Sequence, residues 1–314
     1  MRGAVAVRPL RIALVGLGKI ARDQHLPALR DNPAFEVAAT VCPYGSAAEG
    51  IPAFAALDAV RAAGIALDAA AICTPPQVRH DLAAEAIAQG LHVLLEKPPA
   101  ATPAEAASLA SLAAERGSTL FAAWHSRFAA GVEPARAWLE GRRVLGVTIT
   151  WREDVRVWHP GQAWIWQRGG FGVFDPGINA LSIATRILPG PIALTGAELE
   201  IPANCEAPIA ARLTLQTASG APIAADFDFR QTGPQTWDIE VETDAGPLRL
   251  SHGGAVLSLP GGTRHGSNSE YPALYARFAQ LVADGTSEVD TEPLRLVAEA
   301  LERGRAIRTE PFHD

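Results

Sequence analysis

Short apolar runs alternate with amphipathic stretches through the first part of the chain. The runs predict strands, and these are Arg11–Val15, Glu36–Val41, Ala69–Cys73, Val93–Leu95 and Thr119–Ala123. Helical periodicity falls between most of them, over Ile20–Asn32, Val78–Gln89 and Ala104–Arg116. Alternating strands and helices predict right-handed βαβ units and a parallel sheet.

After Arg127 the pattern changes to consecutive strands with Gly, Pro and Asp turns, which favours a largely antiparallel sheet. The strands are Val144–Trp151, Gly196–Ile201, Ala210–Thr217, Ile223–Arg230, Thr236–Glu242, Pro247–Ser251 and Ala255–Leu259. The helices are Val132–Leu139, Pro176–Leu188 and Glu292–Arg308. We therefore predict an α/β domain over residues 1–127 and an α+β domain over 128–291, with the helix at about 292–308 packing back on the first domain.

Composition narrows the class of protein. The chain has 314 residues, 48% of them hydrophobic and 19% charged, with a formal net charge of −7. No basic stripe is present, so nucleic acid is not an expected partner. The cysteines Cys42, Cys73 and Cys205 are scattered, which predicts a reducing compartment and neither disulfides nor a metal site. No signal peptide or membrane-length run is recognisable, so we expect a soluble cytoplasmic protein without a membrane partner.

A glycine motif follows the first strand directly. Gly16 permits a tight turn, Gly18 lets the backbone approach a pyrophosphate, and Ala21 allows close packing of helix on strand. The helix that opens there offers free N–H groups to phosphates. This placement predicts a Rossmann dinucleotide-binding domain.

The segment LHVLLEKPP ends an apolar run with a carboxylate, an ammonium and two prolines. Prolines stop strand pairing, so Glu96 and Lys97 should lie at the carboxyl edge of the sheet, where open α/β folds place their chemistry. A solvated loop with an ordinary exposed lysine is the alternative.

A second cluster lies in the segment WREDVRVWHPGQAWIW. It holds four of the seven tryptophans, which are Trp151, Trp158, Trp164 and Trp166. An indole ring suits the apolar face of a sugar, although a tryptophan-rich core is an equally simple interpretation. The interleaved polar residues favour binding, and they are Glu153, Asp154, His159 and Gln162.

Asp175 and Pro176 are typical of a helix start, so Asp175 could be only an N-cap. Asn179 lies four residues on, on the same face of the helix, and both side chains could reach one ligand. His125 follows a strand and is a weaker candidate. We assign no functional role to His25 or His80.

GLGKIA, EKPP and the Asp-x-x-x-Asn helix together resemble the Gfo/Idh/MocA oxidoreductases, over essentially the whole chain. The longer motifs WREDVR-x-WHPGQ-x-WIW and FDPGINALSI are similar to those of bacterial L-arabinose and D-galactose 1-dehydrogenases. The resemblance implies NAD or NADP as cofactor, a sugar as substrate and a homodimer.

The resemblance also implies roles for individual residues. The catalytic residues would be Lys97, Asp175 and Asn179. The substrate-binding residues would be Glu153, His159, His125, Trp158 and Trp164. The cofactor-binding residues would be Gly16, Gly18, Lys19, Ile20, Thr74, Pro75, Pro76, Glu96 and Lys97.

The implied reaction oxidises the C1 hydroxyl of an aldopyranose such as D-galactose, L-arabinose or D-fucose to the lactone. Many family members have histidine where Asn179 stands, and an amide cannot take a proton. The base is therefore either Asp175 or Lys97, and the sequence does not separate them.

Two other functions stay open. A non-catalytic NAD(P)-dependent, sugar-responsive regulator would be expected to lose Lys97 or the Asp175/Asn179 pair, which this chain keeps. An aldose or inositol dehydrogenase could act at another carbon. For the cofactor, the segment Val41 to Ser46 has neither the acidic residue typical of NAD sites nor the arginine of NADP sites, which weakly favours NAD.

Overall fold

The computed structural model describes residues 8–45, 47–267 and 269–313, and it divides into two compact units. Unit 1 combines the described residues up to Ala123 with Tyr271–Val289. Unit 2 combines Trp124–Glu270 with the residues from Asp290 onward. The chain therefore visits unit 1 twice. Ser46, part of the segment used above for cofactor preference, lies outside the described residues.

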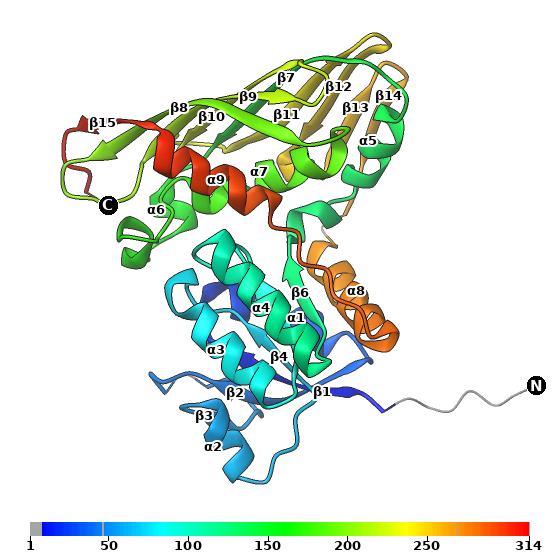
Figure 1. The fold of residues 1–314 in the computed structure, drawn as a ribbon, viewed down its shortest axis with the longest axis vertical. Coiled ribbons are helices and arrows are strands. Elements are labelled where there is room, and N and C mark those ends of the chain that lie inside the picture. Colours follow the sequence, from blue (N-terminus) through cyan, green and yellow to red (C-terminus); the bar gives the residue numbers. More distant parts are fainter. Residues whose placement is uncertain (1–7, 46, 268, 314) are drawn as a thin grey trace, which may run out of the picture. The chain divides into compact units, whose positions relative to one another are not determined.

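Unit 1 contains a six-stranded sheet with the order β3-β2-β1-β4-β5-β6, all strands parallel (Figure 1). The strands are β1 (Leu10–Val15), β2 (Phe35–Val41), β3 (Ala53–Phe54), β4 (Ala69–Ile72), β5 (His92–Glu96) and β6 (Leu120–Ala123). The helices of its first segment are α1 (Leu26–Arg30), α2 (Leu57–Ala62), α3 (Pro76–Ala88) and α4 (Pro103–Arg116). The predicted Rossmann sheet is confirmed, whereas β3 and α2 were not predicted.

The helix predicted over Ile20–Asn32 opens with a π-helical turn, Ala21–His25, before α1. The N–H of Leu26 bonds back to the carbonyl of Ala21, five residues earlier. Pro27 follows at the start of α1 and has no N–H to donate, so the regular hydrogen-bond ladder is interrupted there.

The second segment of unit 1 carries α8 (Glu270–Asp284), a helix that the sequence analysis missed. Phe278 stacks on Phe35 of β2 and on Phe121 of β6, and Tyr275 meets the edge of Phe35. A late helix does return to the first unit, but it is α8 and not the C-terminal one.

Unit 2 is built on a nine-stranded sheet with the order β14-β13-β12-β11-β7-β10-β9-β8-β15. Its strands are β7 (Val144–Arg152), β8 (Ile192–Pro202), β9 (Ala210–Thr217), β10 (Pro222–Asp228), β11 (Thr236–Thr243), β12 (Gly246–Ser251), β13 (Val256–Leu259), β14 (Gly262–His265) and β15 (Arg305–Thr309). Only the β7–β10 and β8–β15 pairs are parallel, so the largely antiparallel sheet is confirmed. Three helices lie along one face, α5 (Val132–Leu139), α7 (Phe174–Ile187) and α9 (Glu292–Arg303) (Figure 1).

The C-terminal helix is shorter than predicted and packs elsewhere. α9 ends at Arg303 and contacts α7 and β8 within unit 2, so its predicted extension to 308 and its return to the first domain are wrong. At Gly304 a Cβ would lie 2.4 Å from the Ala300 carbonyl oxygen, so the close turn there requires glycine. The chain then forms β15, parallel to β8.

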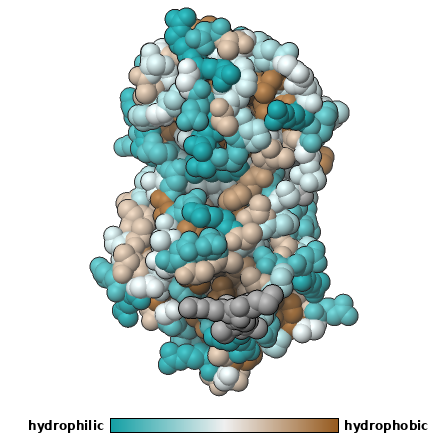
Figure 2. All heavy atoms as spheres, turned by 90° about the vertical axis from the view of Figure 1, so that its right-hand side faces the viewer, coloured by the Kyte–Doolittle hydropathy of each residue, from teal (hydrophilic) through white to brown (hydrophobic). Residues whose placement is uncertain are grey.

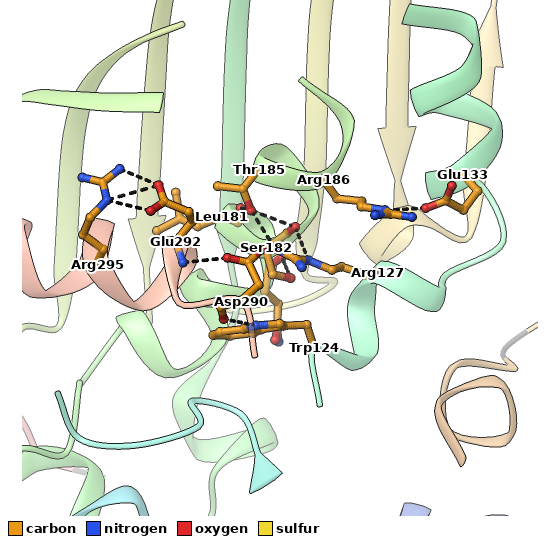
Figure 3. A network of polar contacts seen from close by, with 11 residues as sticks. Trp124, Arg127, Glu133, Leu181, Ser182, Thr185, Arg186, Asp290, Glu292 and Arg295 are labelled. Atoms are coloured by element: carbon orange, nitrogen blue, oxygen red, sulfur yellow. Dashed lines mark hydrogen bonds and ion pairs between the residues drawn. The ribbon is translucent and has the colours of Figure 1, made fainter. Parts of the chain in front are cut away.

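A polar network holds α7 to the two segments where the chain enters unit 2 (Figure 3). Arg127 donates to the Ser182 carbonyl at 2.9 Å, to the Thr185 hydroxyl at 3.0 Å and to the Asp290 carboxylate at 2.5 Å. The indole N–H of Trp124 donates to the Asp290 carbonyl at 2.9 Å. Because Arg127 is largely buried, these bonds fix the C-terminal half of α7.

Hydrophilic and hydrophobic residues are interspersed on the face drawn in Figure 2, and hydrophilic ones cover most of it. No helix of the described residues is long and apolar enough to span a membrane.

Candidate functional site: a dinucleotide turn and a buried carboxylate–imidazole cluster

The glycine motif forms a tight turn at the end of β1. Gly16 has φ +89°, and a Cβ there would lie 2.8 Å from Cγ2 and 2.9 Å from the backbone N of Thr74. No side chain fits, so β1 and β4 end in close contact because residue 16 is glycine. A Cβ on Gly18 would meet nothing within 4 Å, so this backbone is open to a large group.

The dinucleotide fits this edge of unit 1. β1 and β4 are neighbours at the point where the strand order reverses, and α/β folds bind nucleotides there. Thr74 follows β4, and its buried hydroxyl has no hydrogen-bond partner among the described residues. Pro75 and Pro76 then begin α3. An open glycine backbone beside an unsatisfied hydroxyl is suited to a bound cofactor.

Two other predicted cofactor residues lie on the same turn. Lys19 forms an ion pair with Asp23 one helical turn on, and Ile20 directly precedes the π-helical turn. Their contact with a dinucleotide stays a prediction.

Arg22 is a residue that the sequence analysis missed. Its guanidinium donates to the carbonyl of Ala47, at 3.3 Å, in the loop that follows β2. Ribose hydroxyls or a 2′-phosphate are read at this loop in Rossmann domains. The loop itself carries no cation, but Arg22 brings one beside it.

Arg79 of α3 was also missed. It is 3% exposed, and its guanidinium donates to the carbonyls of Thr74, Glu96 and Pro98, the bond to Glu96 being 2.5 Å. One side chain thus joins the turn after β4 to the turn after β5. The Lys97–Pro98 peptide bond between two of these acceptors is cis.

Glu96 is the last residue of β5, as predicted, and its carboxylate lies in the interior at 2% exposure. Tyr271 donates to Oε1 at 2.5 Å, His25 lies 3.2 Å from the same oxygen, and the backbone N–H of Lys97 donates to Oε2 at 2.6 Å. We therefore interpret Glu96 as a support for the half-buried Lys97 and not as a direct cofactor ligand.

His25, which received no role, belongs to this cluster. Its Nδ1 lies 2.7 Å from the hydroxyl of Tyr275. Burial by itself lowers the pKa of His25, but the neighbouring sulfur of Cys73 and the carboxylate of Glu96 raise it to about 9. Burial, Cys73 and Glu96 together raise the pKa of Tyr275 well above its ordinary value.

In unit 2, Asp175 is not the N-cap that the sequence suggested. α7 begins at Phe174, Val173 is its cap, and the backbone N–H of Asp175 bonds the Gly172 carbonyl. The carboxylate, in the first turn and 5% exposed, lies 3.7 Å from Nδ1 of His159. Asn179 is one turn further along α7 and partly exposed, so the expected placement of the pair on one helix is confirmed.

Glu153 and His159 lie in contact. Glu153 follows β7, and His159 directly follows the short helix α6 (Val155–Trp158). Nε2 of His159 lies 3.0 Å from Oε1 of Glu153, and the indole N–H of Trp237 donates to Oε2 at 2.8 Å. Glu153 is only 2% exposed, so direct binding of a sugar hydroxyl, as expected above, is not favoured. Trp237 of β11 was missed because it is 84 residues from Glu153.

The four clustered tryptophans divide between two environments. Trp151 is buried and stacks on Trp237 at 5.7 Å, so it belongs to the core. Trp166 packs against Phe229. Trp158 is 38% exposed over Trp237, at 4.7 Å between ring centroids, and Trp164 is partly exposed, so these two remain candidates for a sugar face.

His125 lies in a 3₁₀ turn after β6, and its Nδ1 bonds the Glu270 carboxylate at 2.6 Å. Its role near a sugar stays a prediction.

Comparison with known proteins agrees with this geometry. Residues 10–123 match the model of the GFO_IDH_MocA oxidoreductase family with an NAD-binding Rossmann fold. Galactose 1-dehydrogenase of Pseudomonas fluorescens is 45% identical over 98% of this chain and 100% of its own length. The chain belongs to the Gfo/Idh/MocA oxidoreductase family. It is an oxidoreductase with an NAD-binding Rossmann domain.

Solved structures extend the likeness to unit 2. The D-galactose-1-dehydrogenase protein of Rhizobium etli is 49% identical, has a TM-score of 0.93, and is matched over 98% of this chain and 99% of its own. KijD10, a 3-ketoreductase of Actinomadura kijaniata in complex with NADP, has a TM-score of 0.82 at 20% identity, over 96% of this chain and 99% of its own. At that identity the likeness shows the fold alone.

Proposed function

We propose that this protein oxidises the C1 hydroxyl of a galactose-configured aldopyranose to the lactone, with NAD or NADP as hydride acceptor. The observation that carries the proposal is the buried Asp175 carboxylate beside His159, at the start of α7. Relatives at 45% and 49% identity over nearly the whole chain are named galactose 1-dehydrogenases, which supports the choice of sugar and of carbon.

In the proposed mechanism Asp175 accepts the proton of the C1 hydroxyl, and Asn179 orients the sugar by hydrogen bonding. Lys97 donates a hydrogen bond to the same oxygen and stabilises the negative charge that develops on it. A bound NAD or NADP would supply the acceptor for the hydride of C1. Trp158 and Trp164 cover the apolar face of the ring. In a second version of this mechanism, Lys97 and not Asp175 is the base that accepts this proton.

A non-catalytic sugar-responsive regulator is the alternative from another class. Such a protein would not need an ammonium and a carboxylate at positions 97 and 175, and this chain has both. An aldose or inositol dehydrogenase of other regiochemistry differs only in the carbon presented to the cofactor.

One experiment separates these functions. The purified protein is mixed with NAD or NADP and D-galactose, reduced nicotinamide is followed by absorbance, and the sugar product is identified by NMR. We expect cofactor reduction and a 1,5-lactone. Binding without reduction would indicate a regulator, and a keto-sugar would indicate another regiochemistry.

We further propose that the protein is a cytoplasmic homodimer. All three cysteines are buried and in the reduced form, as is common in reducing compartments. The dimer is expected through the sheet face of unit 2 on which alternate side chains are exposed, such as those of β9 and β10. Light scattering of the purified protein and fractionation of the source cells test these two proposals.

A further inference from the structure

Glu153 has the environment of a buried structural carboxylate. Each of its oxygens has a partner, His159 Nε2 at 3.0 Å and the Trp237 indole N–H at 2.8 Å. Its side chain is 2% exposed, whereas that of His159 is 14% exposed. A buried carboxylate with a partner on each oxygen orients the neighbouring side chains and does not bind a substrate hydroxyl.

The contact with Glu153 decides which nitrogen of His159 carries the proton. An ionised carboxylate only accepts hydrogen bonds, so Nε2 must be the donor. Nδ1 is then the unprotonated nitrogen in the neutral ring, and it lies 3.7 Å from Oδ2 of Asp175. This is longer than a hydrogen bond, as is common for catalytic pairs before the substrate binds.

Two carboxylates face the ring of His159 from different elements. Glu153 faces it from the end of β7 and Asp175 from α7, and the ring of Phe229 at 5.4 Å is uncharged. Arg156, on the helix that leads into His159, is paired with Asp154 at 2.8 Å. The ring of His159 therefore lies between two carboxylates, with one facing each nitrogen.

We infer that Glu153 is a positioning residue: together with Trp237 it holds His159 in the Nε2–H form, so that His159 takes up the proton that Asp175 accepts from the substrate. His159 thereby supplies the proton acceptor that Asn179, an amide, cannot be. The inference rests on the proposed function and assigns the route by which the proton of the C1 hydroxyl leaves the site.

The C1 hydroxyl proton passes to the Asp175 carboxylate and then to Nδ1 of His159, while the C1 hydrogen leaves with its electron pair to the nicotinamide and the C1–O bond becomes a carbonyl. His159 then releases the proton to solvent through its exposed edge. The order of contacts runs from the Asp175 carboxylate to the His159 imidazole to the Glu153 carboxylate. It resembles a catalytic triad, in which a carboxylate orients the histidine that accepts the proton.

The test compares Glu153→Gln with Glu240→Gln, a control that changes an exposed carboxylate on β11, the strand that carries Trp237. For Glu153→Gln we expect kcat to fall about a hundredfold or more, with KM for D-galactose and the Kd for NAD within about threefold of the parent. A raised KM with an unchanged kcat would instead make Glu153 a sugar ligand and overturn the inference.

Two further variants test the proton route. Turnover of His159→Ala should recover in part when imidazole is added to the assay, since a small base can enter the space left by the ring. Trp237→Phe keeps the ring stacking, loses one hydrogen bond to Glu153, and should lower kcat by about tenfold. If imidazole does not restore His159→Ala, or Trp237→Phe keeps the parental kcat, the inference is wrong.

A spectroscopic measurement separates this inference from the proposed function. In ¹⁵N-labelled protein, long-range proton–nitrogen correlations report the tautomer of each imidazole, and the signal of His159 is identified by its loss in His159→Asn. We expect the proton on Nε2 in the parent and a mixture of tautomers in Glu153→Gln. A proton on Nδ1 in the parent overturns the inference even if the enzyme oxidises galactose; a parent that oxidises no aldose while His159 is Nε2–H overturns only the function.

Discussion

The imidazole of His25 and the carboxylate of Glu96 lie 3.2 Å apart in the interior of unit 1. His25 is fully buried and Glu96 is 2% exposed, so neither charge is screened by water. The pair supports the backbone of Lys97, because the second oxygen of Glu96 accepts the N–H of that residue at 2.6 Å. The protonation of His25 is therefore linked both to folding and to the position of Lys97.

Stability should fall with rising pH because of His25. Its pKa is raised from 6.5 to about 9 in the folded protein, so its contribution is fully present below about 6.5 and is lost as the pH rises through 9. The free energy of unfolding, measured with urea from pH 6 to 9.5, should fall by up to about 3 kcal/mol. The pKa of Tyr275 is raised well above 10, so its titration lies outside this range.

His25→Gln provides the comparison for this pH dependence. The variant is expected to be less stable overall, but its stability should change far less between pH 6.5 and 9. His80→Gln, which alters a histidine that is 31% exposed, should keep the parental slope. Equal slopes for the parent and His25→Gln would assign the pH dependence to other groups.

Arg79→Ala should weaken both folding and cofactor binding. The change leaves the carbonyls of Thr74, Glu96 and Pro98 without their donor in the interior, at a cost of about 1–3 kcal/mol for each group that stays unpaired. We expect a lower urea midpoint and a raised KM for NAD. Arg116→Ala, at an exposed arginine near the end of α4, is the control, and an equal effect of both changes would contradict a specific role for Arg79.

Local pattern was sufficient to predict the strands of unit 1 except the two-residue β3, and the placement of Lys97 directly after β5. Strands buried on both faces leave uninterrupted apolar runs, and Gly16 shows directly where the turn must be tight. The end of α9 was also readable, since Gly304 follows Arg303 directly. Tyr271, Leu274, Tyr275 and Phe278 carry the helical period of α8, which could have been recognised.

The hydrogen-bond partners of the candidate site residues could not be predicted from the sequence. Glu153 meets Trp237 because β7 and β11 pair antiparallel with Trp151 opposite Trp237, and that register joins positions far apart in the chain. Tyr271 reaches Glu96 across 175 positions because α8 belongs to unit 1 although it comes late in the chain. Asp175 was misassigned as a cap because Asp-Pro is a common helix start, whereas α7 begins at Phe174, two residues before the predicted start at Pro176.

Arg22 is expected to let the enzyme accept NADP as well as NAD. Its guanidinium lies beside the loop after β2, where a 2′-phosphate would be held. Arg22→Ala should lower kcat/KM for NADP by about tenfold and leave that for NAD within about twofold, because a charge-assisted hydrogen bond is worth roughly 1.5–3 kcal/mol. Arg30→Ala, at an exposed arginine of α1, is the matched control. An equal loss with both cofactors would show that Arg22 does not read the phosphate.

The sugar specificity should follow the configuration at C4. D-Galactose, L-arabinose and D-fucose share their ring hydroxyl configuration at C2 to C4, so one pocket should accept all three. The C4 hydroxyl of D-glucose points the other way and would leave a buried polar group unpaired, which lowers kcat/KM by about tenfold to a hundredfold. Steady-state assays over the four sugars measure this, and equal turnover of D-glucose and D-galactose would refute a pocket that reads C4.

Asp175→Asn distinguishes the two candidate bases. The amide has nearly the shape of the carboxylate, and because Asp175 lies in the first turn of α7 and is not its N-cap, we expect the folded state to lose only about 0.3–1 kcal/mol from the helix dipole. If Asp175 is the base, the variant still binds NAD but turns over about a hundredfold or more slowly at neutral pH. Lys97→Met should be slow under either assignment, since a thioether neither donates a hydrogen bond nor stabilises charge. An Asp175→Asn enzyme that keeps most of the parental rate would therefore make Lys97 the base and leave Asp175 as a partner of His159.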